Sequence, residues 1–191
     1  MSDTGSVTGL ILAGGKSRRF GSNKAVHPIG GDPMIGRVLR SVSSVCENVL
    51  ISVGDEPLPL ELAEGVCYVY DEIPNAGPLA GICAGFHASS SPWILAVACD
   101  MPFITEDALR HLLRARSPSL QAVVAVEDEG REHPLCACYH RDILPVVETQ
   151  LARGHRAMRD LLRQLGRVQT VLLPNDALRN INAPGDLPTV R

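Results

Sequence analysis

The feature that most constrains the fold is an uninterrupted apolar run, WILAVA, at Trp93–Ala98. A strand with one face in water alternates apolar and polar residues, whereas a strand buried on both faces is apolar throughout. We therefore expect this run to be a central strand of a parallel sheet with helices on both faces. Apolar residues make up 45% of the 191-residue chain and aromatic residues only 4%, which fits an aliphatic core of this kind.

Strand-like and helix-like patterns alternate along the rest of the chain, as they do in βαβ units. Thr105 is expected to cap a helix that begins at Glu106. The predicted strands are Val7–Leu12, Asn48–Val53, 67–70, Trp93–Ala98, Ala122–Val126, 134–139 and 168–173, and the predicted helices are 33–45, 79–88, 106–116, 142–151 and 157–165. The pattern predicts a single α/β domain over residues 1–191, Rossmann-like and three-layered. Its sheet is expected to be mostly parallel, with antiparallel additions in the second half.

The overall charge and the length of the apolar runs argue against several classes of protein. The net charge is −3, whereas nucleic-acid binding normally requires a basic face. No apolar run approaches the ~20 residues of a membrane span, and the polar start MSDTGS is unlike a signal peptide. The six cysteines show no CxxC pair and no zinc-type spacing with histidine. We expect a cytoplasmic protein with reduced thiols that binds neither nucleic acid nor membrane.

A glycine pair and a group of cations follow the first predicted strand, in the segment LILAGGKSRRFGSNK. Gly14 and Gly15 let backbone N–H groups approach a ligand closely, because glycine has no Cβ. The cations are Lys16, Arg18, Arg19 and Lys24. Together these residues predict an anion site, for which a polyphosphate is the natural occupant. The spacing matches neither a P-loop nor a Rossmann glycine motif, and an ordinary glycine turn with solvated cations is the alternative.

Two carboxylates also follow predicted strands. Asp100 comes directly after the central apolar run, at the strand end where open α/β sheets bind ligands, and a carboxylate there suits Mg²⁺. Asp71 ends the third predicted strand, and Gly77 and Gly81 follow it, where a helix backbone can approach a flat base. The alternatives are a carboxylate that caps a turn and simple close packing of helix on sheet. Taken together, the loops predict a nucleoside triphosphate pocket without a P-loop.

Three segments carry a family resemblance: LAGGKSRRFGSNK, PLAG after Asp71, and CDMPF around Asp100. They resemble the nucleotidyltransferases of molybdenum cofactor synthesis, most closely the guanylyltransferase branch. HPLCACY (133–139), HRAMRDLLR (155–163) and NINAPGDL (180–187) extend the resemblance over nearly the whole chain. It implies a Mg²⁺-dependent enzyme that transfers GMP from GTP to molybdopterin, usually carrying molybdenum. Pyrophosphate would leave and a guanine dinucleotide cofactor would form.

The resemblance also implies roles for particular residues. Lys24 would bind the phosphates, Arg19 would lie near the leaving pyrophosphate, and Asp100 would ligate Mg²⁺. The implied GTP-binding set is Leu12, Ala13, Gly14, Gly15, Lys24, Ser52, Asp71 and Asp100. About residues 7–116 would bind the nucleotide and about 117–191 the pterin acceptor, whose implied contacts are His133, Asn180 and Asn182.

Several alternatives remain open from the sequence. The guanylyltransferase branch has an asparagine where this chain has Ser52. This difference leaves both GTP and CTP open as the nucleotide substrate. The sequence LAGG, against LAAG in the cytidylyltransferase branch, favours guanine. Sugar-phosphate nucleotidyltransferases are usually longer, and a non-catalytic nucleotide-binding partner protein would be expected to lack Asp100 or Lys24. A molybdoenzyme or a chaperone is a possible partner for product handover.

Overall fold

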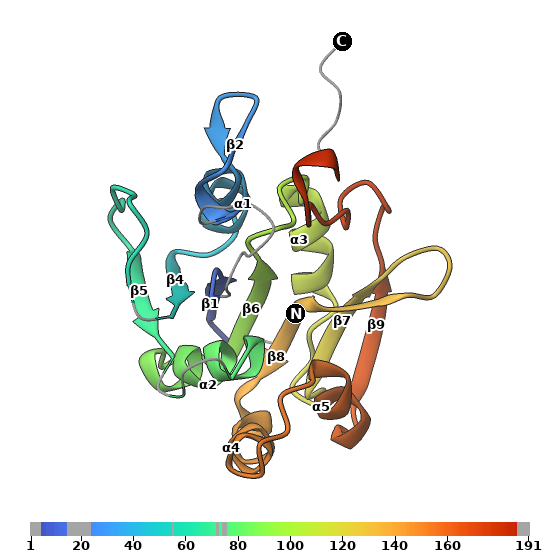
Figure 1. Ribbon diagram of the computed structural model, residues 1–191. Coiled ribbons are helices and arrows are strands. Elements are labelled where there is room, and N and C mark those ends of the chain that lie inside the picture. The colour runs from blue at the N-terminus through green and yellow to red at the C-terminus, as the bar shows by residue number, and fades with distance from the viewer. Residues whose placement is uncertain (1–4, 15–23, 55, 72, 74–75, 187–191) are drawn as a thin grey trace.

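A computed structural model of the chain describes residues 5–14, 24–54, 56–71, 73 and 76–186. Its centre is a seven-stranded sheet with the strand order β5-β4-β1-β6-β8-β7-β9 (Figure 1). The strands are β1 (Val7–Leu12), β4 (Asn48–Val53), β5 (Val66–Tyr70), β6 (Trp93–Ala98), β7 (Ala122–Val126), β8 (Glu132–His140) and β9 (Val168–Leu172). Only β8 pairs antiparallel with its neighbours in this sheet, and the other pairings are parallel. The expected α/β architecture is therefore confirmed, including the antiparallel addition in the second half.

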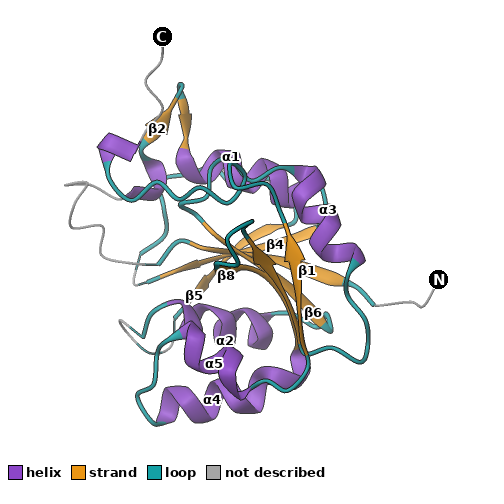
Figure 2. Ribbon diagram, turned by 90° about the vertical axis from the view of Figure 1, so that its right-hand side faces the viewer, coloured by secondary structure: helices purple, strands orange, loops and turns teal. Residues whose placement is uncertain are grey.

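Helices cover both faces of the sheet (Figure 2). One face carries α1 (Met34–Ser43) and α3 (Glu106–Arg114), and the other carries α2 (Pro78–Ala88), α4 (Leu144–Ala152) and α5 (Met158–Gln164). The short 3-10 helices are η1 (Lys24–Val26), η2 (Arg141–Ile143) and η3 (Pro184–Asp186). Among the described residues, none of these helices has both the length and the apolar character that a membrane crossing requires.

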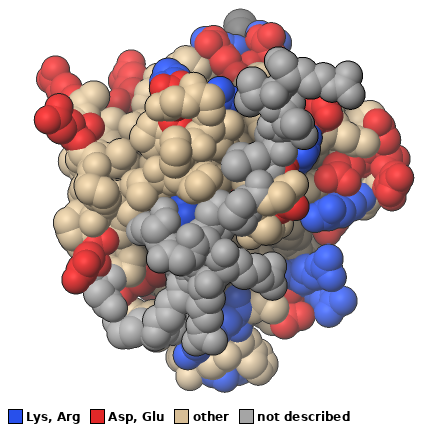
Figure 3. Space-filling model, turned by 45° about the horizontal axis from the view of Figure 1, so that its top comes forward, with Lys and Arg blue, Asp and Glu red and all other residues tan. Residues whose placement is uncertain are grey.

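The central strands are buried on both faces, as the apolar runs predict. In β6, Ile94 and Ala96 belong to the core beneath α2, α4 and α5, whereas Leu95 and Val97 belong to the core beneath α1 and α3. Successive side chains of a strand point to opposite faces, so an all-apolar strand supplies two cores at once. On the molecular surface shown in Figure 3, acidic and basic side chains are interspersed.

The structure differs from the sequence prediction in several details. The predicted helix at 142–151 is divided into η2 and α4, and Pro145 lies in the first turn of α4, where proline needs no helical N–H partner. Pro33 lies just before α1 and pairs in a small hairpin, β2 (Pro28–Ile29) with β3 (Asp32–Pro33), which the sequence analysis missed. The hairpin turn at Gly30 and Gly31 has positive φ at both residues, a conformation that glycine adopts without strain.

The strand order defines where a ligand site is expected. From β1 the chain moves to β4 and β5 on one side, and then crosses to β6 on the other side of β1. The carboxyl ends of β1 and β6 therefore flank the point where the direction of winding changes, and open α/β sheets bind ligands there. Because β8 is antiparallel, its beginning lies at this same edge, beside the ends of β6 and β7.

Candidate active site

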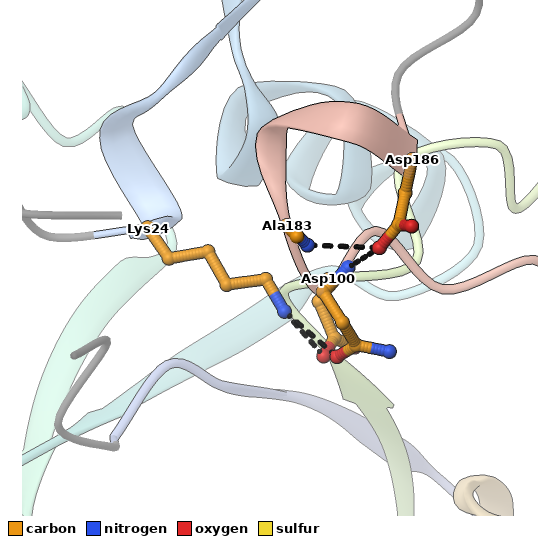
Figure 4. Close-up of polar contacts among 5 residues, drawn as sticks. Lys24, Asp100, Ala183 and Asp186 are labelled. Carbon is orange, nitrogen blue, oxygen red and sulfur yellow. Dashed lines mark hydrogen bonds and ion pairs between the residues drawn. The ribbon is translucent and has the colours of Figure 1, made fainter. Parts of the chain in front are cut away.

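Lys24, Asp100 and Asn182 meet at the end of β6 (Figure 4). The Lys24 Nζ donates to Asp100 Oδ2 at 2.9 Å and to Asn182 Oδ1 at 3.1 Å. The lysine and aspartate side chains are only 13% and 21% exposed. Partial desolvation strengthens their attraction compared with a surface ion pair. The structure thus brings together one residue from the expected triphosphate loop, the expected metal ligand and one residue expected on the acceptor side.

Backbone contacts position these groups. The Cys99 N–H donates to Leu12 O, which ties the end of β6 to the end of β1, and the Ile181 N–H donates to Asp100 O. The N–H groups of Asn182 and Ala183 both donate to Asp186 Oδ2, at 2.7 and 2.8 Å. These two bonds lower the pKa of the Asp186 carboxyl below its ordinary value. The segment 181–186 is therefore held as a turn that presents Asn182 to Lys24.

A second cluster lies at the ends of β4 and β5. Ser52 donates a hydrogen bond from its hydroxyl to Asp71 Oδ1 at 2.9 Å. Burial raises the pKa of the Asp71 carboxyl, and the bond from Ser52 opposes that shift. A Cβ on Gly81 of α2 would come within 2.5 Å of Ser52 Oγ, and one on Gly14 would lie 3.4 Å from Asp71 Oδ2. The absence of side chains at Gly14 and Gly81 therefore keeps this corner of the sheet edge compact.

Other predicted site residues have more varied positions. The Ala13 N–H donates to Ser52 O, so this N–H is already paired within the sheet. Gly15 and Arg19, like Lys16 and Arg18, lie outside the described residues. A Cβ at Gly85 would lie within 3.3 Å of the Leu10 and Ile94 side chains, so this glycine serves close packing of α2 on the sheet.

His133 forms a contact that the sequence analysis missed. Its Nε2 lies 2.6 Å from Glu127 Oε1, with the two side chains only 6% and 17% exposed. Glu127 follows β7 and His133 lies near the start of β8, so this pair is at the same sheet edge as Asp100. Glu127 lies at the start of the segment between the predicted strands 122–126 and 134–139, and the sequence gives no signal for its contact with His133. Asn180 Oδ1 is buried and has no hydrogen-bond partner among the described residues.

The Asp100 carboxylate fits a hard cation. Its Oδ2 accepts from Lys24, while its Oδ1 is buried without a hydrogen-bond partner in the described part of the chain. A buried carboxylate oxygen without a partner is costly, and a divalent cation is a suitable partner for it. Asp100 and nearby phosphate oxygens would supply the hard oxygen ligands that Mg²⁺ prefers.

Several solved structures share this fold. A structure titled molybdopterin-guanine dinucleotide biosynthesis protein A, from Archaeoglobus fulgidus, has a TM-score of 0.74, with 24% identity and 94% of both chains covered. A 2-C-methyl-D-erythritol 4-phosphate cytidylyltransferase from Thermus thermophilus has a TM-score of 0.69, with 19% identity and 93% of both chains covered. At these identities the likeness establishes the fold, which is that of the nucleotidyltransferases.

The sequence comparisons identify the family. The family model described as the MobA-like NTP transferase domain matches residues 9–169, and the chain belongs to this family of nucleotidyltransferases. A relative from Desulfosudis oleivorans named molybdenum cofactor guanylyltransferase is 37% identical over 166 residues, which cover 86% of this chain and 80% of the relative. A probable molybdenum cofactor guanylyltransferase from Pelotomaculum thermopropionicum is 37% identical over 194 residues, with 97% and 92% covered. The expected resemblance is confirmed.

Proposed function

We propose that this chain transfers GMP from GTP to molybdopterin and releases pyrophosphate. The observation that carries the proposal is the contact of Lys24 with both Asp100 and Asn182 at the winding change of the sheet. This contact joins the loop expected to hold the triphosphate with the C-terminal segment expected to face the acceptor. The family and the names of the relatives supply the substrate class.

The proposed reaction needs electrostatic stabilisation more than proton transfer. An oxygen of the terminal phosphate of molybdopterin forms a bond to the α-phosphorus of GTP, and the bond from that phosphorus to the bridging oxygen of pyrophosphate breaks. The nucleophile is already an anion, so no strong general base is required. Lys24, partly withdrawn from water, offsets negative charge that accumulates around the α-phosphorus. Asn182 keeps the ammonium group oriented toward the reacting phosphates.

Mg²⁺ is the metal that this site would hold, with Asp100 as the protein ligand. It would supply charge neutralisation for the phosphate oxygens. When no nucleotide is bound, the positive charge of Lys24 offsets the negative charge of Asp100 in their ion pair. Binding of the nucleotide then gives Lys24 a further anionic partner, and Asp100 is available for the cation.

The two halves of the chain have separate roles in this proposal. About residues 7–116 bind the nucleotide, with the base and ribose near Ser52, Asp71 and Gly81. About residues 117–191 bind the pterin, with His133 and Asn180 at the same sheet edge. The buried Oδ1 of Asn180, which has no partner among the described residues, supports an acceptor contact for its side chain.

The proposal is tested by pyrophosphate release from purified protein with Mg²⁺ and molybdopterin, comparing GTP, CTP, ATP and UTP. We expect turnover with GTP. Asp100→Ala and Lys24→Ala should each lower kcat by about 100-fold or more, because each removes a charge that contacts the reacting phosphates. Glu106→Gln and Arg110→Gln are the matched controls, since they remove an exposed ion pair of 2.6 Å on α3 and should leave kcat unchanged.

The nucleotide series also separates the alternatives. If the protein prefers CTP, the reaction it catalyses is cytidylyl transfer. Ser52 favours this second candidate, because serine stands where the guanylyltransferase branch has an asparagine. Turnover that is equal in the Asp100→Ala variant and in the controls would contradict the role of Asp100. If no pyrophosphate is released with any nucleotide, the proposed catalysis is contradicted. The remaining alternative is then a protein that only binds nucleotide.

A further inference from the structure

A second group of potential ligands lies between α2 and α4, away from the sheet edge. It consists of Cys83 and His87 on α2 and Glu148 on α4, and one ligand atom from each lies within 4.8 Å of the other two. Cys83 and His87 are four residues apart, so both lie on the same face of the helix. The His87 Nε2 is 3.0 Å from Glu148 Oε1. No other group of three Cys, His, Asp or Glu side chains meets this distance in the described part of the chain.

We propose that these three side chains form a Zn²⁺ site that links α2 to α4. Zinc accepts thiolate, imidazole and carboxylate ligands together, at about 2.0–2.3 Å. The ligand atoms around a tetrahedral ion are therefore roughly 3.3–3.8 Å apart. The present separations, all within 4.8 Å, are close to that range. Mg²⁺ is a poor occupant because it prefers oxygen ligands.

The surroundings suit a metal that keeps one open position. The His87 and Glu148 side chains are 43% and 50% exposed, so a water molecule can complete the tetrahedron from the solvent side. Cys83 is half-buried and borders a small cavity, whose lining is Ile73, Ala80, Cys83, Ala84, His87 and Leu151. The apolar wall shields the thiolate from bulk water and strengthens its attraction to the ion. One thiolate, one carboxylate and one neutral imidazole also balance the charge of Zn²⁺.

Two sequence features explain why this site is not visible in the chain alone. Cys83 and His87 form a Cys-x₃-His pair on one helix, and zinc motifs recognised from sequence place two such pairs close together. The third ligand here is a glutamate 61 residues beyond His87, and only the packing of α4 against α2 brings it near. A bound ion would connect an element of the proposed nucleotide-binding half with an element of the proposed acceptor half.

The test is Co²⁺ binding, because Co²⁺ replaces Zn²⁺ and absorbs light when it is bound tetrahedrally by a thiolate. Protein reduced with a phosphine is titrated in buffer without Mg²⁺. We expect one Co²⁺ per chain, a near-ultraviolet thiolate-to-cobalt band, and loss of that band when Zn²⁺ is added. Cys83→Ser should abolish the band. Glu148→Gln should weaken binding by at least about tenfold, since loss of a direct ligand costs no less than loss of an outer contact.

The matched control is Cys67→Ser, which removes an exposed thiol on β5 that is not part of the cluster. This variant should keep both the thiolate band and the affinity for Co²⁺. Zn²⁺ should also raise the Tm of the parent and of Cys67→Ser, but not that of Cys83→Ser. A parent without a thiolate band at saturating Co²⁺, a band that persists in Cys83→Ser, or a band lost in Cys67→Ser would each overturn the proposal. None of these measurements depends on nucleotidyl transfer.

Discussion

Asp71 illustrates how the sheet edge changes the chemistry of a single residue. Its carboxyl is partly buried beside Gly14 and accepts a hydrogen bond from Ser52. Burial raises its pKa in the folded protein above the value of 3.8 that is ordinary for aspartate. The folded state therefore binds this proton more tightly than the unfolded state does. The contribution of Asp71 to the free energy of unfolding is therefore largest below the ordinary pKa. It is lost as the pH rises through the folded-state pKa.

Asp71→Asn removes this titration and gives a prediction about pH. We expect the stability of the variant, relative to the parent, to increase as the pH rises from about 4 and then to become constant above the folded-state pKa. Urea unfolding of both proteins between acidic and neutral pH measures the difference. A relative stability that instead decreases with rising pH would mean that the pKa of Asp71 is lowered in the fold, contrary to the effect of burial.

Single residues also show how much of the site was predictable from sequence. Lys24 and Asp100 could be selected because each follows an apolar strand and has the charge that a metal–phosphate site requires, and they lie 2.9 Å apart. The charge of a single side chain and its position after an apolar strand are enough for such a prediction. The partner of His133 was not predictable, because Glu127 reaches it through the antiparallel pairing of β7 with β8. The sequence predicts antiparallel strands in this half but not their register, which shifts between Val124 and Ala125.

At the scale of an element, α2 is notable for its close approach to the sheet. A Cβ at Gly81 would lie 2.5 Å from Ser52 Oγ and 2.7 Å from Leu12 Cδ2, both closer than real contacts allow. Gly81→Ala therefore requires Ser52, Leu12 or the helix itself to shift. Overpacking costs about 1–3 kcal/mol, while alanine regains up to about 1 kcal/mol of helix propensity. We expect a net loss on the order of 1 kcal/mol, together with a higher KM for GTP because Ser52 is displaced.

Gly166→Ala is the control for this prediction. Gly166 has open space where its Cβ would be placed and no left-handed φ, and it follows α5 rather than α2. Its replacement should change the free energy of unfolding by less than about 0.5 kcal/mol and leave the KM for GTP unaltered. Unfolding in urea and initial rates over a GTP series provide the two readouts. Equal behaviour of the two variants would contradict a role of close packing at Gly81.

The bounds of the strands and helices were predicted more accurately where the local sequence signal is strong. β1, β4, β6 and β7 have the predicted bounds, because each is mostly apolar and ends where small or polar residues follow. Helix ends were less accurate: α1 ends at Ser43 and α3 at Arg114, each two residues before the predicted end. The local signals for a last turn are weak, and packing determines where the helix stops. The hairpin of β2 and β3 has too few residues to produce a periodic signal.

At the scale of the whole molecule, Arg141 fastens the second half of the chain to the first. It follows β8, and its guanidinium donates to the carbonyl oxygen of Phe86 in α2 and to those of Ser89 and Ser91 in the segment between α2 and β6. Phe86 also lies beneath the guanidinium, 5.4 Å from ring centroid to the central carbon. Hydrogen bonds from a charged donor contribute about 1.5–3 kcal/mol each. This one side chain therefore contributes substantially to the joining of the two halves.

Arg141→Leu should lower the free energy of unfolding by about 3 kcal/mol, because the carbonyl oxygens lose a charged donor. Arg141→Lys should recover only a small part of this loss, since an ammonium group cannot replace the planar fork of donors. Arg163→Ala is the control: its side chain is 78% exposed in a pair with Asp160, and its removal should have almost no effect. Full stability of Arg141→Lys in urea unfolding would show that charge alone is sufficient.

The contact between Lys24 and Asn182 joins residues separated by 158 positions in the chain. A ribosome makes the lysine 158 positions before the asparagine. The pair of Lys24 with Asp100 requires only residues up to position 100. The bond from Lys24 to Asn182 waits for the last turn that the structure describes, so the site can be complete only after synthesis has passed Asn182.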